Sequence, residues 1–301
     1  MSSTSDAGDA GFRTDLRTSA IEAKPITDAD TWAVAEFMHR QMYSGASVAD
    51  WRRLMMPPGD VEQPNHGYLL CENGRVVGAY LAMYSERVID GRPRRICNLG
   101  AWCVVPEHRA SGLRLLRALL RQRGYTFTDL TPSKTVVALD TRLGFTPLDT
   151  ATALVPNLPW PVQSKGQRVV DTGNEIQELL SGRDLTVYRD HAETPVNHVV
   201  LVKGDESCYV MYRRVRRRRL RLFAYILFVA NPRLFEECAP QFYRYLLLRH
   251  GMVATLAEIR VVGHRPKPAV MIPGWSRMYL SEDLEPKQID YLYSEMTCRP
   301  W

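Results

Sequence analysis

Residues 102–124 read WCVVPEHRASGLRLLRALLRQRG and predict a strand, a tight turn and a helix. Pro106 has no N–H to give to a sheet, so the apolar strand that contains Val104 and Val105 must end before it. Helical spacing begins near Gly112, with leucines on one face and arginines on the opposite face. A helix N-terminus presents unpaired N–H groups and partial positive charge, so this turn can bind a phosphate group.

Two short motifs resemble those of a known family. VVPEHRASG resembles the acyl-CoA-binding signature of the GNAT superfamily of acyltransferases, in which Arg/Gln-x-x-Gly-x-Gly/Ala opens a helix after a strand. Five of the six positions from Arg109 to Arg114 are compatible, and Arg114 stands where the family has Gly or Ala. Leu143-Gly144-Phe145 is similar to the Leu-Gly-Phe that ends the last helix of the family core. The resemblance implies an α/β (α+β) fold with a mixed, mostly antiparallel sheet flanked by helices.

The resemblance also implies a co-substrate, acetyl-CoA or another acyl-CoA, and no metal. Backbone N–H groups from Ala110 to Arg114 would bind the diphosphate, and Gly112 would allow its close approach. An N–H near Val104 or Val105 would polarise the thioester carbonyl. The expected binding residues are Val104, Val105, Arg109, Ala110, Ser111, Gly112, Leu113, Arg114 and Ser133. For the Arg114 side chain, a place in a solvated arginine stripe is favoured over a contact to a coenzyme A phosphate.

The general acid and base stay unassigned at the level of sequence. Many family members carry a Tyr four residues before the Gly of Leu-Gly-Phe, and this chain has Asp140 there. A helix-surface carboxylate is the favoured interpretation of Asp140, because an acid role would need burial to raise its pKa. Glu72, Glu107 and His66 are possible bases, each favoured as a solvated side chain, and Cys103 is favoured as a buried thiol. Glu72 and Asp140 are the catalytic candidates.

Chain length and a proline-rich segment predict two domains. A chain of 301 residues exceeds the usual size of one domain. Residues 1–19 are expected to form a disordered tail, 20–158 the acyl-CoA-binding domain, and 159–301 a second GNAT-like domain. The border is marked by three prolines in residues 156–161. At its own strand–helix corner the second half has Asn231-Pro232 and no glycine, so it is expected to lack the phosphate-binding turn.

Periodicity and turn signals predict the individual elements. Asn73-Gly74 is expected to close one hairpin and Asp90-Gly91 another. The expected strands and helices that matter below are strands 67–72, 76–84, 95–105, 126–130, 145–154, 198–203, 208–213, 220–229 and 254–261, and helices 133–143, 174–180, 234–250 and 285–296.

Positive charge is concentrated in one short segment of the chain. The net charge is +6, and seven arginines lie in RRVRRRRLR, so the rest of the chain sums to 6 − 7 = −1. A solvated hairpin tip is the favoured interpretation, and an anionic partner is the alternative, with nucleic acid the weakest case. The arginines are Arg213, Arg214, Arg216, Arg217, Arg218, Arg219 and Arg221.

Composition predicts a cytoplasmic location. The six cysteines are scattered without a C-x-x-C pair, which favours buried thiols in a reducing compartment. The sequence contains no uninterrupted apolar run of about 18 residues, and its start lacks the apolar region of a secretory signal. No spanning helix is therefore expected.

These observations favour an acyl-CoA-dependent acyltransferase that transfers an acyl group, most often acetyl in the family, to a small-molecule or peptide amine. Two alternatives remain open. One is a non-catalytic relative that binds acyl-CoA or scaffolds an anionic partner, and the other is a long-chain N-acyltransferase.

Overall fold

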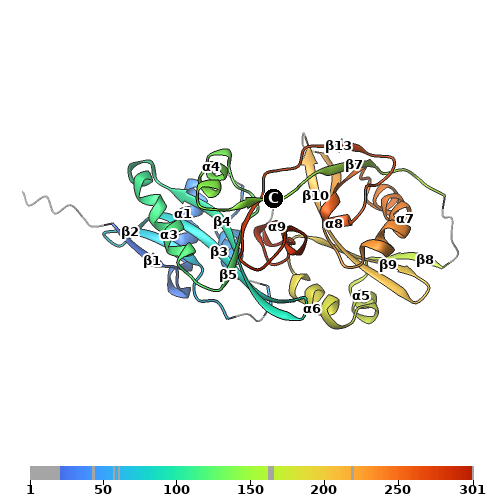
Figure 1. Cartoon of the computed structure of the whole chain (residues 1–301), viewed down its shortest axis with the longest axis horizontal. Coiled ribbons are helices and arrows are strands. Elements are labelled where there is room, and N and C mark those ends of the chain that lie inside the picture. Colours follow the sequence, from blue (N-terminus) through green and yellow to red (C-terminus); the bar gives the residue numbers. More distant parts are fainter. Residues whose placement is uncertain are drawn as a thin grey trace, which may run out of the picture.

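The computed structural model describes residues 21–42, 45–56, 58–59, 62–161, 166–217 and 220–299, so the predicted tail of residues 1–19 lies outside it. The described residues form two halves that lie side by side, each built on a seven-stranded sheet flanked by helices (Figure 1). The predicted α/β fold class is confirmed.

The first sheet carries the strand of the phosphate motif. In spatial order it contains β1 (Glu22–Pro25), β2 (Gly67–Glu72), β3 (Arg75–Ile89), β4 (Arg92–Val104), β5 (Tyr125–Asp129), β14 (Met278–Leu280) and β6 (Thr146–Pro147). Neighbouring strands are antiparallel except β4 and β5, which run parallel. Asn73-Gly74 and Asp90-Gly91 form the predicted turns, with positive φ at all four residues. Paired left-handed residues match the twist of a two-residue hairpin, so both turn predictions are confirmed.

Helices cover both faces of this sheet. On one face lie η1 (Asp28–Asp30), α1 (Thr31–Gln41) and α2 (Val48–Met55), and residues of α1 and α2 pack on Ala79, Leu81 and Met83 of β3. Alternate residues of a strand point to opposite faces. Tyr80 and Tyr84 accordingly belong to the other cluster, with Leu115 and Leu116. That face carries η2 (Pro106–Ser111), α3 (Gly112–Leu120) and α4 (Lys134–Arg142).

The second sheet repeats this plan. In spatial order it contains β13 (Val270–Ile272), β7 (Thr152–Pro156), β12 (Ala254–Glu258), β11 (Leu220–Val229), β10 (Glu206–Arg217), β9 (Asn197–Lys203) and β8 (Gln167–Val170). Only β11 and β12 pair in parallel, as β4 and β5 do in the first sheet. The helices after the first sheet's α4 are α5 (Gly173–Leu179), α6 (Gly182–His191), α7 (Pro232–His250), α8 (Ile259–Val262), η3 (Pro286–Gln288) and α9 (Glu295–Cys298). The shared plan agrees with the predicted tandem arrangement.

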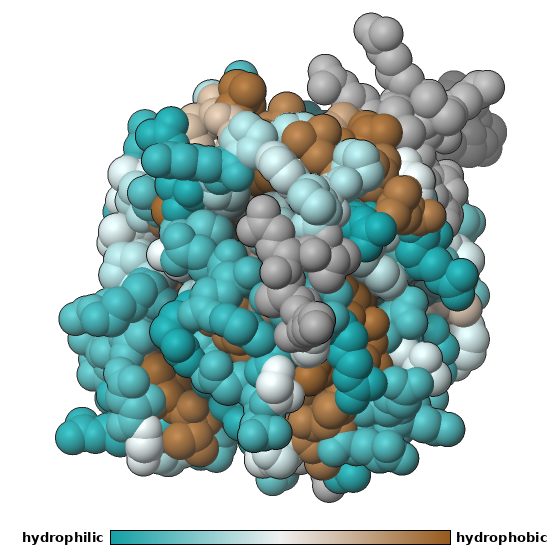
Figure 2. Space-filling model, turned by 90° about the vertical axis from the view of Figure 1, so that its right-hand side faces the viewer, coloured by the Kyte–Doolittle hydropathy of each residue, from teal (hydrophilic) through white to brown (hydrophobic). Residues whose placement is uncertain are grey.

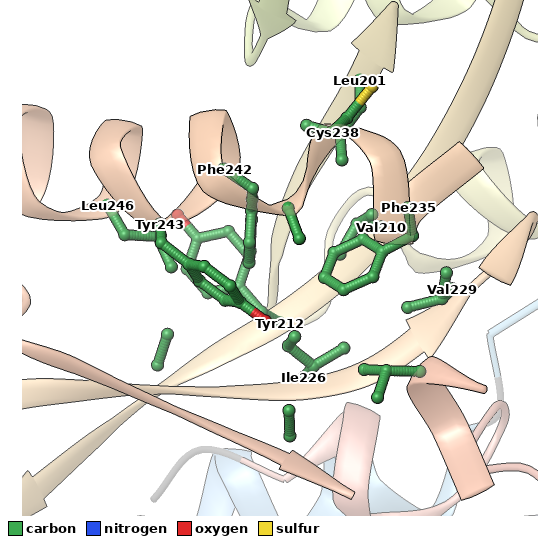
Figure 3. Close-up of a cluster of buried hydrophobic side chains, with 14 of the residues drawn as sticks. Leu201, Val210, Tyr212, Ile226, Val229, Phe235, Cys238, Phe242, Tyr243 and Leu246 are labelled. Carbon is green, nitrogen blue, oxygen red and sulfur yellow. The ribbon is translucent and has the colours of Figure 1, made fainter. Parts of the chain in front are cut away.

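The core of the second half forms between α7 and its sheet. Phe235 and Phe242 project from α7 toward Val210 and Ile226 of the central strands (Figure 3). Asn231 caps the helix by accepting a hydrogen bond from the Leu234 N–H at 3.1 Å, and Pro232 occupies the first turn. The outer end of this half is mostly hydrophilic, with small separate hydrophobic patches (Figure 2).

The two halves exchange strands. β7 follows β6 closely in the chain but belongs to the second sheet, and β14 comes from the last part of the chain but lies in the first sheet between β5 and β6. The predicted closing strand 145–154 is therefore wrong as one element, because its two ends lie in different sheets. The chain first crosses between the sheets over residues 148–151, and not at the proline-rich border at 156–161.

The predicted helix 285–296 is also wrong. Its first and last turns form η3 and α9, and the residues between them are not helical. Ile289, Tyr291 and Leu292 are all buried, and Tyr293 has a φ of 55°. Burial in several directions and a left-handed residue are incompatible with an amphipathic surface helix. This segment, with α9, lies between the two halves (Figure 1).

Candidate active site

The predicted strand–turn–helix unit is present, and its turn is a 3-10 helix. In η2 the His108 N–H donates to the Val105 carbonyl at 3.0 Å, and the Gly112 N–H donates to the Arg109 carbonyl. A Cβ at Gly112 would lie 3.3 Å from both Trp102 and Val104. The glycine therefore lets α3 begin directly against β4. Because the Gly112 N–H is already used, the next amides at this helix start are those of Leu113 and Arg114.

Two side chains among the predicted binding residues, those of Arg114 and Ser133, make local hydrogen bonds. The Arg114 guanidinium donates from Nη1 to the Ile21 carbonyl at 2.8 Å, just before β1. Ser133 caps α4 by accepting a hydrogen bond from the Val136 N–H at 3.3 Å. Arg109 and Ala110 are exposed on the turn. A ligand at this turn would therefore meet main-chain groups and the exposed Arg109.

Strands β4 and β5 separate to form a fork beside this turn. Their parallel pairing ends at Leu99 and Asp129, whereas β4 continues to Val104 and stays paired with β3 up to Gly78. In the part of the chain that the structure describes, no strand pairs with residues 100–104 on the side of β5. The main-chain groups of this edge can therefore bind an extended ligand.

The segment at α9 closes the base of the fork. The Glu295 N–H donates to Asn98 Oδ1 at 3.1 Å, and Asn98 Nδ2 donates to the Thr128 carbonyl at 3.2 Å. Asn98 thus joins β4, β5 and α9 one residue before the fork opens. The Thr131 hydroxyl donates to the Glu295 carboxyl group, which is also buried.

Asp140 lies inside this region, so its interpretation as a helix-surface carboxylate is wrong. Its exposed fraction is 0%, and that of Asp129, at the end of β5, is 4%. Burial raises the pKa of Asp140 to about 6, and the neighbouring Asp129 opposes that rise. Burial and the charges of Glu295 and Asp140 raise the pKa of Asp129 well above its usual range. The physical reason is that α4 turns Asp140 inward, onto the end of a neighbouring strand.

The other acid–base candidates lie in different contacts. Glu72 Oε2 is 3.2 Å from His108 Nε2, which ties the end of β2 to η2. His66 is 7% exposed and its Nε2 is 2.7 Å from Asp28, so the prediction of a solvated side chain is wrong for His66. Glu107 is exposed, and burial raises the pKa of the half-buried Cys103 thiol.

Several residues of the fork were not identified from the sequence. Tyr80 and Trp102 stack with ring centroids 4.7 Å apart on the face that carries α3. Tyr80 also lies close to Asp129 and lowers the pKa of that carboxyl group against the larger effect of burial. Asp129 ends a strand, and a carboxylate at a strand end is a common enough pattern that it gives no signal alone. Only the register of β4 and β5 brings these side chains together.

The arginine-rich strand pair is only partly described. Arg213 is largely covered, with its guanidinium carbon 5.5 Å from the Tyr225 ring centroid, and burial lowers its pKa to about 10. Arg214 is exposed and lies 3.2 Å from His250 Nδ1. The predicted solvated tip also includes Arg218 and Arg219, which lie outside the described residues. The side chains of Arg216, Arg217 and Arg221 lie outside the description as well. Arg213 therefore packs inward and is not part of a solvated tip.

Among the described residues, no group of three or more His, Cys, Asp and Glu side chains could hold a metal ion. None of the helices that the structure describes is both long and apolar enough to cross a bilayer.

The fold is that of the GNAT acyltransferases, as the two sequence motifs indicate. A GCN5-related N-acetyltransferase from Anabaena variabilis matches with a TM-score of 0.59 at 12% identity, over 86% of this chain and 72% of that protein. The GCN5-related N-acetyltransferase from Kribbella flavida matches with a TM-score of 0.53 at 14% identity, over 86% and 71%. These matches span both halves, and at such identities they establish the fold alone. Comparison by sequence finds no matching family model and no matching curated protein.

Proposed function

We propose that the protein is an acyltransferase that moves an acyl group, acetyl in the simplest case, from coenzyme A to an amine. The observation that carries the proposal is the fork, where residues 100–104 have an open edge beside the start of α3. An extended pantetheine arm can pair with such an edge. The diphosphate can bind the amides of Leu113 and Arg114, at the positive end of the helix. The amine acceptor is supported by the N-acetyltransferases among the similar structures.

One main-chain amide is suited to polarise the thioester carbonyl. The Val105 N–H donates to the Val77 carbonyl on β3 at 3.0 Å. N–H groups of successive residues in a strand point to opposite sides, so the Val104 N–H is directed toward the fork. When a neutral amine attacks the carbonyl carbon, this N–H can stabilise the developing oxyanion. Of the two predicted donors, we therefore propose Val104.

Free-thiol release tests the proposed activity. The full chain is incubated with acetyl-, octanoyl- or palmitoyl-CoA and a panel of amines, and binding of each acyl-CoA is measured by calorimetry. We expect amine-dependent thiol release, fastest with acetyl-CoA. Faster release with palmitoyl-CoA would instead indicate the long-chain N-acyltransferase. Tight binding with no thiol release for any amine would contradict catalysis and favour a non-catalytic acyl-CoA binder.

A charge placed on the turn tests the diphosphate site. Ala110→Glu adds a carboxylate on the exposed turn beside the proposed diphosphate. Like charges at this separation repel, so we expect acyl-CoA to bind about tenfold more weakly, which corresponds to ~1.4 kcal/mol. Calorimetry with acetyl-CoA measures the change, and circular dichroism verifies the fold.

Val88→Glu is the matched control for this experiment. Val88 is 62% exposed near the far end of β3, where it pairs with Pro93. The same charge there should leave the affinity unchanged. Equal affinities for the two variants would contradict a diphosphate site at the turn.

We also propose a cytoplasmic setting and an anionic acceptor or partner. The setting is supported by the six cysteines, which are all free. The partner is supported by the exposed Arg214 beside the rest of the arginine-rich strand pair. An acidic acceptor should then show a KM that rises with salt.

A further inference from the structure

Two aspartates from different elements face each other beneath the fork. Asp129 is the last residue of β5, and Asp140 lies in the second half of α4. Each carboxyl group lies close enough to the other to change its pKa, and both residues are at least nine-tenths buried. Neither oxygen of Asp140 has a hydrogen-bond partner among the described residues. Two ionised carboxylates offer no donor to each other, so a hydrogen bond between Asp129 and Asp140 requires a proton on one of them.

The surroundings of the pair favour one bound proton at neutral pH. The groups that act on its charge are Tyr80, which lowers the pKa of Asp129, and the buried carboxyl group of Glu295. Both desolvation and the nearby acidic group oppose a second negative charge on the pair. Burial raises the pKa of both carboxyl groups, so the pair holds one proton that the two aspartates share. Because the two sites are coupled, the pair titrates as a unit.

One member of the pair, Asp129, borders the fork. Asp129 is the residue at which β5 leaves β4, opposite Leu99. The Tyr80 ring that contacts Asp129 is stacked on Trp102, which belongs to the open edge of β4. An acyl-CoA arm along that edge would therefore carry its thioester past the carboxyl group of Asp129.

We propose that Asp129 is the catalytic residue that protonates the leaving thiolate, and that Asp140 is a positioning residue that holds this proton in place. The inference rests on the acyltransferase function proposed above. The amine nitrogen forms a bond to the acyl carbon, the carbon–sulfur bond breaks, and the electron pair stays on sulfur. Asp129 gives its proton to that sulfur, and the nitrogen loses one proton to water. The pair then regains a proton from water, so that the products are an amide and the free thiol of coenzyme A.

The pH dependence of thiol release in two variants tests this assignment. Asp129→Asn keeps the shape of the side chain but cannot donate an acidic proton. A general acid typically contributes about 10²–10⁴-fold, so we expect kcat to fall at least about 100-fold with little change in KM for acetyl-CoA. The wild type should show a fall of kcat at high pH, where the carboxyl pair loses its proton, and this fall should be absent from Asp129→Asn. In Asp140→Asn the repulsion between the carboxylates is removed, so that fall should move to lower pH.

Asp205→Asn is the matched control. It makes the same chemical change at an exposed hairpin tip in the second half, and should reproduce the wild-type pH profile. Calorimetry with acetyl-CoA and thermal unfolding establish that each variant is folded and binds.

The two proposals fail in different ways. A wild-type protein that releases no thiol from any acyl-CoA overturns the acyltransferase function, and the proton donor with it. A wild-type enzyme that turns over, with Asp129→Asn equal to it in kcat and pH profile, overturns the donor assignment alone. A fall in kcat whose pH profile is unchanged in both variants also counts against it, because a merely structural role gives that result.

Discussion

Replacing Arg277 with alanine is expected to destabilise the protein by about 3–5 kcal/mol, the usual cost of breaking a buried ion pair. Arg277 is 2% exposed and Glu258, its partner at 3.2 Å, is 0% exposed. The same guanidinium donates to the Leu130 carbonyl at 2.6 Å and to the Tyr225 hydroxyl. Leu130 follows β5, whereas Tyr225 and Glu258 belong to the second sheet, so Arg277 joins the two halves. Thermal or urea unfolding measures the loss.

Arg233→Ala provides the comparison for this prediction. Its side chain is 67% exposed and pairs with Glu206 and Glu237 at the surface. Exposed pairs contribute about 0–1 kcal/mol, so this variant should unfold near the wild-type midpoint. Similar losses for the two variants would show that Arg277 does not connect the halves as described.

Asp140→Asn is expected to stabilise the protein at neutral and alkaline pH. The folded-state pKa of about 6 exceeds the ordinary value of 3.8, so the folded protein holds the Asp140 proton more tightly than the unfolded chain does. The contribution of Asp140 to stability is therefore fully present below about pH 4 and is lost as the pH rises through about 6. At ~1.4 kcal/mol per pKa unit, the wild type loses about 3 kcal/mol over this interval.

Unfolding midpoints measured across this pH range for both proteins test the sign. The difference in the free energy of unfolding between Asp140→Asn and the wild type should grow from about pH 4 to about pH 7 and then level off. Asp205→Asn should show no such growth. A variant that is less stable than the wild type at pH 8 would be evidence against a destabilising buried carboxylate. If Asp140→Asn is more stable than the wild type but less active at high pH, then Asp140 lowers the stability of the fold while it serves the activity, as residues of functional sites often do.

The sequence is sufficient to predict turns, helix starts and helix faces, because these depend on residues that are close together in the chain. Asn73-Gly74 specifies its own turn, and the leucines of α3 specify most of its buried face, although Leu113 is 40% exposed. Ser133 signals the start of α4, three residues before the amide that it caps. The fold class follows from such local signals in the right order, and the fold matches confirm it.

The environment of Asp140 could not be predicted in this way. Whether a polar residue on an amphipathic helix faces solvent or protein depends on what lies opposite, here Asp129. That neighbour is fixed by the register of β4 and β5, which the sequence does not specify. The strand exchange escaped prediction for the same reason, since β14 has only three residues and pairs with strands far away in the chain.

The place of β14 bears on how the chain folds during synthesis. The ribosome releases residues in order, yet the first sheet needs a strand from the last tenth of the sequence to fill the gap between β5 and β6. At 5–20 residues/s, roughly 130 residues separate β6 from β14, a delay on the order of ten seconds. Throughout that time the nascent N-terminal half would expose the unfilled edges of β5 and β6 to chaperones and to other nascent chains.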